Sequence, residues 1–209
     1  MRLDILLVKR GYFSSRQRAK ECIKRGLVYV NGEKITKPSA DVDVNAKIEV
    51  LGKDRPKGYW KLEEIDSKFN LFSGNEIVLD LGSSAGGFLL YASEKAKFVY
   101  GIEYSKDFEE YLKKIERKRR NVKVFIADAF KFDVKTLPEF DVILNDLTLP
   151  FTHSMTALRR YLPKLKKSGK VLFIHKIGDR EEPKFEGFKI LKVMDSKNKK
   201  ERYYLLSLS

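Results

Sequence analysis

Residues 78–88, which read VLDLGSSAGGF, decide the fold. An apolar run ends in Asp80 and then breaks into small residues, with glycine at positions 82, 86 and 87. This order predicts a buried strand that leads into a glycine-rich turn. In open α/β folds, ligands bind at such turns, outside the carboxyl ends of the strands. The stretch therefore predicts a turn that holds a ligand.

Strand-like and helix-like segments alternate from residue 59 onward. The strand-like segments are VLDLG, KFVYGIE, VKVFIAD, DVILND and KVLFIHK, and helical patterns such as the one at 106–117 separate them. This alternation predicts an α/β domain, a parallel sheet with helices on both faces. The turn reads G-x-x-x-G-G, which disfavours a dinucleotide, and it lacks the Lys-Ser or Lys-Thr of a phosphate loop.

Composition limits the class of protein and its partners. A chain of 209 residues has room for a catalytic domain and a small appendage. Its 43 Lys and Arg residues exceed its 29 Asp and Glu residues, and a net charge of +14 favours a polyanion such as nucleic acid. No run of 18 apolar residues and no charged-then-apolar leader is visible, so we expect a cytoplasmic protein without a membrane span. Cys22, His153 and His175 have no metal-ligand spacing, and we expect no metal.

The first fifty residues are organised differently from the rest. Leucines at helical spacing predict a short helix near the amino end, and Ser14 or Ser15 can cap a second helix. VYVNGEKI at 28–35 predicts a hairpin with an Asn-Gly turn. GKDRPKG at 52–58 is polar and contains Gly and Pro, which is typical of a boundary. The expected parts of the chain are a small α+β domain, a linker and an α/β domain, at 1–52, 53–58 and 59–209.

RLDILLVKRG, SSRQRAKECIKRGLVYVNG and DVNAKIEV together resemble the αL RNA-binding domain, which is named after the fourth small-subunit ribosomal protein. The resemblance implies an RNA partner and basic side chains that contact phosphates. Phosphate contacts position an RNA and do not read its sequence. RLD at 2–4 also looks like the catalytic Arg-Leu-Asp of pseudouridine synthases, but Asp4 lies inside the binding domain and we discount that role. The residues assigned to phosphate contact are Arg2, Arg16, Lys20 and Lys24.

Acidic residues end three successive strand-like segments. Asp80, the glycine turn, Glu103 and Asp128, in that order, resemble the Rossmann-like methyltransferases that use S-adenosyl-L-methionine. The resemblance implies a Rossmann-like α/β fold, with a mostly parallel sheet of the seven-stranded type and an antiparallel last strand. It also implies that Glu103 binds the ribose hydroxyls and Asp128 the adenine edge, while Gly86 and Gly87 let the backbone approach the methionine end. The cofactor-binding set that we expect is Asp80, Gly82, Gly86, Gly87, Phe88, Glu103, Asp128 and Asp146.

YWKLEEI at 59–65, leading into VLDLGSSAGGF, resembles the FtsJ-type ribosomal RNA 2′-O-methyltransferases. Joined to an αL domain, the chain resembles the TlyA (haemolysin A) family of the same activity. DLTLP at 146–150 departs from the DMAP-like segment of FtsJ, and Phe88 stands where that family usually has Trp. The resemblance implies ribosomal RNA or a ribosomal subunit as partner, and a catalytic set of Lys61, Asp146, Lys176 and Glu201.

A ribose 2′-hydroxyl is a poor nucleophile. Methyl transfer to it therefore requires removal of its proton and an oxygen that lies in line with the sulfonium methyl group. A partly desolvated lysine can serve as the base, or as an ammonium it can orient the oxygen, and we assign this role to Lys176. Lys61 and Glu201 would set its charge state and hold the ribose, and Asp146 would bridge the base, the cofactor and the acceptor.

Two other functions stay open on the sequence alone. A methyltransferase acting on a base amino nitrogen would usually show Asn or Asp followed by two prolines and an aromatic residue after the fourth strand, and NDLTLPF lacks the paired prolines. A protein that binds RNA and S-adenosyl-L-methionine without turnover would also carry both domains. The complete Lys-Asp-Lys-Glu set favours the 2′-O-methyltransferase over both.

Overall fold

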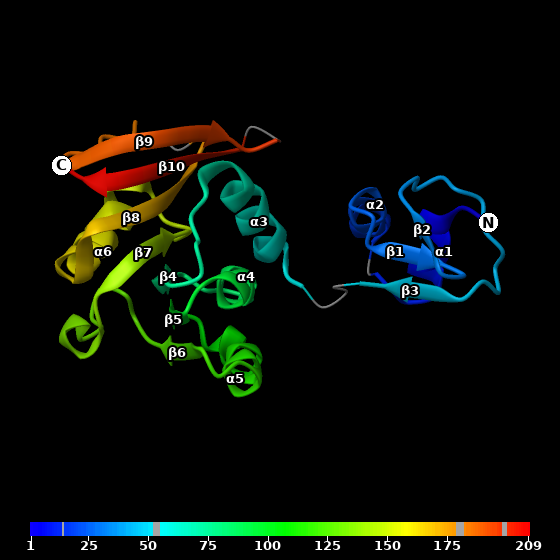
Figure 1. The fold of residues 1–209 in the computed structure, drawn as a ribbon, viewed down its shortest axis with the longest axis horizontal. Helices are drawn as coiled ribbons and strands as arrows, with labels where there is room; N and C mark the ends of the chain where they lie inside the picture. The colour runs from blue at the N-terminus through cyan, green and yellow to red at the C-terminus, as the bar shows by residue number, and fades with distance from the viewer. Residues whose placement is uncertain (14, 52–54, 179–181, 198–199) are drawn as a thin grey trace. The chain divides into compact units, whose positions relative to one another are not determined.

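The structure is a computed structural model that describes residues 1–13, 15–51, 55–178, 182–197 and 200–209. The chain divides into two compact units, Met1–Arg55 and Pro56–Ser209. Figure 1 draws both units, and each is described by itself. Part of the expected linker at 53–58 lies outside the described residues.

Two helices and a small antiparallel sheet form the amino-terminal unit. Ser15 caps the second helix, its hydroxyl accepting a hydrogen bond from the backbone N–H of Arg18 at 3.4 Å. Ser14 lies outside the described residues. Asn31 and Gly32 have φ of 51° and 87°, as the predicted Asn-Gly hairpin turn requires. The elements are α1 (Leu3–Lys9), α2 (Arg16–Lys24), β1 (Val28–Val30), β2 (Glu33–Ile35) and β3 (Ile48–Val50), with strand order β2-β1-β3.

A seven-stranded sheet forms the centre of the carboxy-terminal unit, with the order β6-β5-β4-β7-β8-β10-β9. Strands β4 to β8 run parallel, and β10 is antiparallel to both of its neighbours. This confirms the expected fold class. The strands are β4 (Ile77–Leu81), β5 (Phe98–Glu103), β6 (Val122–Ile126), β7 (Phe140–Asn145), β8 (Leu165–Lys176), β9 (Phe188–Asp195) and β10 (Glu201–Leu208). The helices are α3 (Lys57–Phe69), α4 (Gly87–Lys95), α5 (Glu109–Lys118) and α6 (Phe151–Tyr161).

Helices cover both faces of this sheet (Figure 1). Leu62 of α3 and Leu112 of α5 are fully buried in one apolar core, together with α4 and one face of the strands. Leu158 and Tyr161 of α6 are fully buried in a second core on the opposite face. Among the described residues, no helix is both long enough and apolar enough to cross a membrane.

The strand order reverses at β4, because the chain runs outward through β5 and β6 and then returns to place β7 on the other side of β4. Such a reversal opens a crevice at the carboxyl ends of the two strands that flank it. The glycine turn at 82–87 leaves β4 at this crevice. The fold therefore places the turn where α/β proteins bind their ligands.

Candidate functional site

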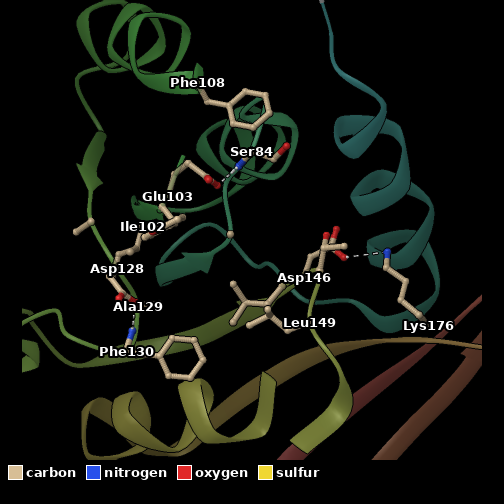
Figure 2. Close-up of a pocket in the computed structure, with 15 residues that line it drawn as sticks. Ser84, Ile102, Glu103, Phe108, Asp128, Ala129, Phe130, Asp146, Leu149 and Lys176 are labelled. Carbon is tan, nitrogen blue, oxygen red and sulfur yellow. Dashed lines mark hydrogen bonds and ion pairs between the residues drawn. The ribbon is translucent and has the colours of Figure 1, made fainter. Parts of the chain in front are cut away.

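A cavity of about 600 Å³ lies at the carboxyl ends of the central strands. Figure 2 shows Glu103 and Asp128 on one side of it and Asp146 and Lys176 on the other. Its volume is within the range of small-molecule and cofactor sites. The residues that line it are Gly82, Ser84, Ile102, Glu103, Tyr104, Phe108, Ala127, Asp128, Ala129, Phe130, Asp146, Leu147, Thr148, Leu149 and Lys176.

Glu103, the last residue of β5, is only 8% exposed and holds two loops at the cavity. Its Oε2 accepts the backbone N–H of Ser84 at 2.7 Å, and its Oε1 accepts that of Ser105 at 2.7 Å. Each carboxylate oxygen has a second lone pair, so the side chain can still accept two hydroxyl groups. The position fits the predicted ribose contact, with an additional role in ordering the glycine turn.

Asp128 and three aromatic side chains also line the cavity. Asp128 accepts the backbone N–H of Phe130 on Oδ1 at 2.8 Å. Tyr104, Phe108 and Phe130 line the same cavity and were missed in the sequence. Each follows a strand-end acid within five residues, which is the signal that could have found them. Carboxylates beside aromatic rings suit a ligand that has both polar groups and a flat ring.

Asp80 lies beneath the turn, fully buried, and does not line the cavity. Neither carboxylate oxygen has a hydrogen-bond partner among the described residues. Burial raises the pKa of Asp80 to about 7, and the charges of Asp146 and Glu103 act in the same direction, against the lowering effect of the nearby Ser83 hydroxyl. Asp80 is therefore poised between its protonated and ionised forms near neutral pH.

The four predicted catalytic side chains meet in one cluster of alternating charge. Lys61 Nζ in α3 lies 2.5 Å from Asp146 Oδ2 and 3.4 Å from Glu201 Oε2. Lys176 Nζ lies 3.8 Å from Asp146 Oδ1 and donates a short hydrogen bond to Glu201. Glu201 and Lys176 are direct partners across β10 and β8. Residues from three strand ends and one helix thus surround a single point at the cavity wall.

Burial and the neighbouring charges shift the pKa values of three side chains in this cluster. Burial lowers the pKa of Lys176, but the hydrogen bond to Glu201 and the charge of Asp146 outweigh burial and raise it. Burial raises the pKa of Asp146 despite the two lysines. Burial also raises the pKa of Glu201, yet the bond from Lys176 and the charge of Lys61 bring it below its usual value. Lys176 therefore keeps its proton, which favours the orienting ammonium over the base.

Besides Asp80, three more predicted cofactor residues lie outside the cavity lining. Phe88 is buried in the core, with Lys61 Nζ 5.3 Å from its ring centroid. Gly86 has a φ of 74°, and a Cβ there would overlap Ile115 of α5. A Cβ on Gly87 would lie 2.5 Å from the backbone nitrogen of Tyr59 in α3. The structure thus gives these two glycines a packing requirement, whereas we had expected them to admit the cofactor.

A further side chain supports the cluster and was missed in the sequence. Tyr203 is 5% exposed, and its hydroxyl donates to Glu201 Oε2 at 3.3 Å. Residues two positions apart in a strand point to the same face of the sheet. The position of Tyr203, two residues after Glu201, was therefore the signal that could have found it.

The predicted RNA-binding residues gather on the amino-terminal unit. Arg16, Lys20 and Lys24 lie on α2 at intervals of four residues, which places them on one side of the helix. Lys24 is exposed and Lys20 is partly exposed. Arg2 lies outside α2, and its guanidinium and that of Arg16 share one partner, the carboxylate of Asp4. The unit thus presents a row of cations with two anchored arginines at its head.

Comparison with known families assigns both units. Residues 55–209 match the model of the FtsJ-like methyltransferases. Residues 1–48 match the model described as the S4 domain.

Individual relatives agree with these matches. A candidate rRNA methyltransferase of Bacillus subtilis, YqxC, is 30% identical over 79% of this chain and 58% of its own length. Hemolysin A of Brachyspira hyodysenteriae is 35% identical over 49% of this chain and 44% of its own length. The chain thus spans about half the length of these curated relatives. A solved structure, a candidate haemolysin of Streptococcus thermophilus, shares the fold with a TM-score of 0.59 at 20% identity, over 100% of this chain and 88% of that one.

Proposed function

Because this chain belongs to the FtsJ-like methyltransferase family, we propose that it methylates the ribose 2′-hydroxyl of an RNA, with ribosomal RNA as the substrate class. S-adenosyl-L-methionine is the cofactor, and it supplies an electrophilic methyl group on a sulfonium. One observation carries the choice of acceptor: Lys61, Asp146, Lys176 and Glu201 form one charged cluster at the wall of the cavity.

The cavity residues fit this cofactor by their chemistry. Carboxylates accept hydrogen bonds from ribose hydroxyls and from an adenine amino group, and Glu103 and Asp128 supply them on one side of the cavity. Phe108 and Phe130 offer apolar surface to an adenine ring. Asp80 lies below the turn, and its carboxylate, which has no hydrogen-bond partner within the described part of the chain, is suited to the positive charge of the methionine end. These residues would hold the cofactor with its methyl group toward the charged cluster.

In the cluster, Lys176 acts as an ammonium that donates a hydrogen bond to the acceptor oxygen and fixes its direction. Glu201 and Asp146 hold that ammonium from two sides. The hydroxyl releases one proton during the transfer, and Asp146 accepts it, because burial raises its pKa and makes it a stronger base than an exposed aspartate. Lys61 neutralises Asp146 at 2.5 Å and keeps it ionised before the transfer.

The amino-terminal unit would supply most of the RNA affinity. Its basic row on α2 binds phosphates without reading the sequence. The carboxy-terminal unit would supply the chemistry.

Methyl transfer to matched substrates tests the acceptor. Tritium from labelled S-adenosyl-L-methionine is counted in a ribosomal RNA fragment that accepts it, and in the same fragment with 2′-deoxyribose at the modified nucleotide. We expect labelling of the first and none of the second. Labelling of both fragments would identify a base as the acceptor and contradict the proposal.

A further inference from the structure

The amino-terminal unit buries one acidic side chain completely. Asp4, in the first turn of α1, has 0% exposure, although an isolated buried carboxylate is strongly unfavourable. Two arginines compensate it: Arg2 donates to Oδ1 from Nε at 3.1 Å and to Oδ2 from Nη2 at 3.3 Å. Arg16 donates to Oδ2 from Nε at 3.3 Å and from Nη2 at 2.9 Å. One carboxylate therefore holds two guanidinium groups.

The two arginines are only partly used by this contact. Their side chains are 47% and 50% exposed, whereas the carboxylate between them is buried. A guanidinium has five N–H donors, and Asp4 accepts two from each, so both retain donors. The three side chains together carry one net positive charge. An ion pair that served only to hold the fold would not need a second half-exposed arginine.

The position of the pair connects it to the basic row. Arg16 is the first residue of α2, and Lys20 and Lys24 follow it at intervals of four residues, about 6 Å apart along the helix axis. The backbone of Arg2 is held by a β-bridge to Asp41, so this arginine is fixed at both its backbone and its side chain. Asp4 thus joins Arg2 to the head of the row.

We propose that Asp4 is a positioning residue for RNA binding, which holds the guanidinium groups of Arg2 and Arg16 in place so that their outward N–H groups receive RNA phosphates. The proposal rests on the RNA-binding role given above to this unit. A flexible arginine loses rotamer entropy when it binds a phosphate, and a side chain that is already fixed loses less. The planar fork of arginine also suits two-point contact with a phosphate, which lysine cannot make.

The direction in which one substitution changes the RNA affinity distinguishes a positioning role of Asp4 from a simple effect of its charge. Asp4→Asn removes a negative charge from a surface that binds a polyanion, so a count of charges predicts tighter RNA binding. The positioning role predicts weaker binding, by roughly tenfold for the two arginines together. Binding of the full-length protein to a fluorescein-labelled RNA hairpin is measured by anisotropy. Glu33→Gln, an exposed acid of β2 in the same unit, is the matched control for charge and should bind the hairpin slightly more tightly.

A second variant tests the proposal if Asp4→Asn does not fold, which thermal unfolding of each variant shows. Arg16→Lys keeps the charge and leaves Asp4 intact, but it lacks the fork that contacts Oδ2 through two nitrogens. We expect weaker hairpin binding than in Arg18→Lys, a matched change at an exposed arginine on the same helix. Equal affinities of Arg16→Lys and Arg18→Lys, or tighter binding by folded Asp4→Asn, would overturn the positioning role.

The same assay tests separately whether this unit binds RNA at the basic row. Lys20→Ala combined with Lys24→Ala removes two charges from the row without touching Asp4. If this double variant binds the hairpin as well as the wild type, the RNA surface has been misassigned. If it binds weakly while Arg16→Lys matches Arg18→Lys, the surface is correct and only the positioning role fails.

Discussion

The substitution Asp80→Asn should remove a pH-dependent loss of stability from the carboxy-terminal unit. Asp80 is fully buried, and both carboxylate oxygens lack partners among the described residues. An asparagine side chain has nearly the same shape and cannot ionise. The substitution therefore removes the titration of one buried group with little change in packing.

The magnitude follows from the two protonation equilibria. Burial raises the pKa of Asp80 from 3.8 to about 7 in the folded protein. The folded state therefore binds a proton that the unfolded state has released, and stability is lost as pH rises from about 4 to about 7. Each pH unit in this window lowers the free energy of unfolding by about 1.4 kcal/mol relative to a chain without this group. The advantage of Asp80→Asn should grow by that amount per unit and level off above pH 7.

Urea unfolding at a series of pH values measures this difference. The single tryptophan, Trp60, lies in α3, so its fluorescence reports on the carboxy-terminal unit. Asp141→Asn is a control of opposite sign. Burial acts to raise the pKa of Asp141, but bonds from the backbone of Ile77 and from Lys166 lower it, so this variant should be less stable than the wild type at neutral pH and approach it as pH falls. Parallel pH profiles for wild type and Asp80→Asn would refute the protonation of Asp80.

Three further outcomes are expected. Glu103→Gln keeps a side-chain oxygen that can accept the backbone N–H of Ser84 but loses the charge, so calorimetry should show S-adenosyl-L-methionine binding weakened by about 1.5–3 kcal/mol, and unchanged affinity would contradict the ribose contact. Turnover should rise with pH as Asp146 ionises and then level off, whereas a continued tenfold rise per alkaline pH unit would show that Lys176 must lose its proton. Lys24→Gln should lower the log–log salt dependence of RNA binding by about 0.7–0.9, and an unchanged slope would remove Lys24 from the phosphate contacts.

The order of the strands made the charged cluster predictable. The carboxyl ends of parallel strands lie at one edge of a sheet, so residues that end β7 and β8 could be expected to meet. Glu201 begins β10, which runs antiparallel to β8, and its pairing with Lys176 follows from that direction. The residues that form β9 were not identified in the sequence, because Lys189 and Lys192 interrupt its apolar residues and several of those are exposed.

Other features depend on contacts between segments that sequence spacing does not reveal. The glycines at 86 and 87 carry the right pattern for a ligand turn, but their lack of a side chain is required by α5 and α3. The burial of Asp4 depends on Arg16, which is distant in the chain and adjacent in the fold. Phe88 was assigned by family position and lies in the core. Each of these features depends on how helices pack against neighbouring segments, and the local sequence pattern does not predict that packing.

The site of the transferred methyl group tests the central claim most directly. Ribosomal RNA is incubated with S-adenosyl-L-methionine and the wild type, Lys176→Ala, or Lys170→Ala, a control on the same strand. The RNA is digested to nucleosides, and tandem mass spectrometry distinguishes a methyl group on the sugar from one on the base. We predict a ribose-methylated nucleoside with the wild type and with Lys170→Ala, and a yield about 10²–10³-fold lower with Lys176→Ala, which loses a positioned hydrogen-bond donor. A methyl group on a base, or undiminished ribose methylation by Lys176→Ala, would contradict the account.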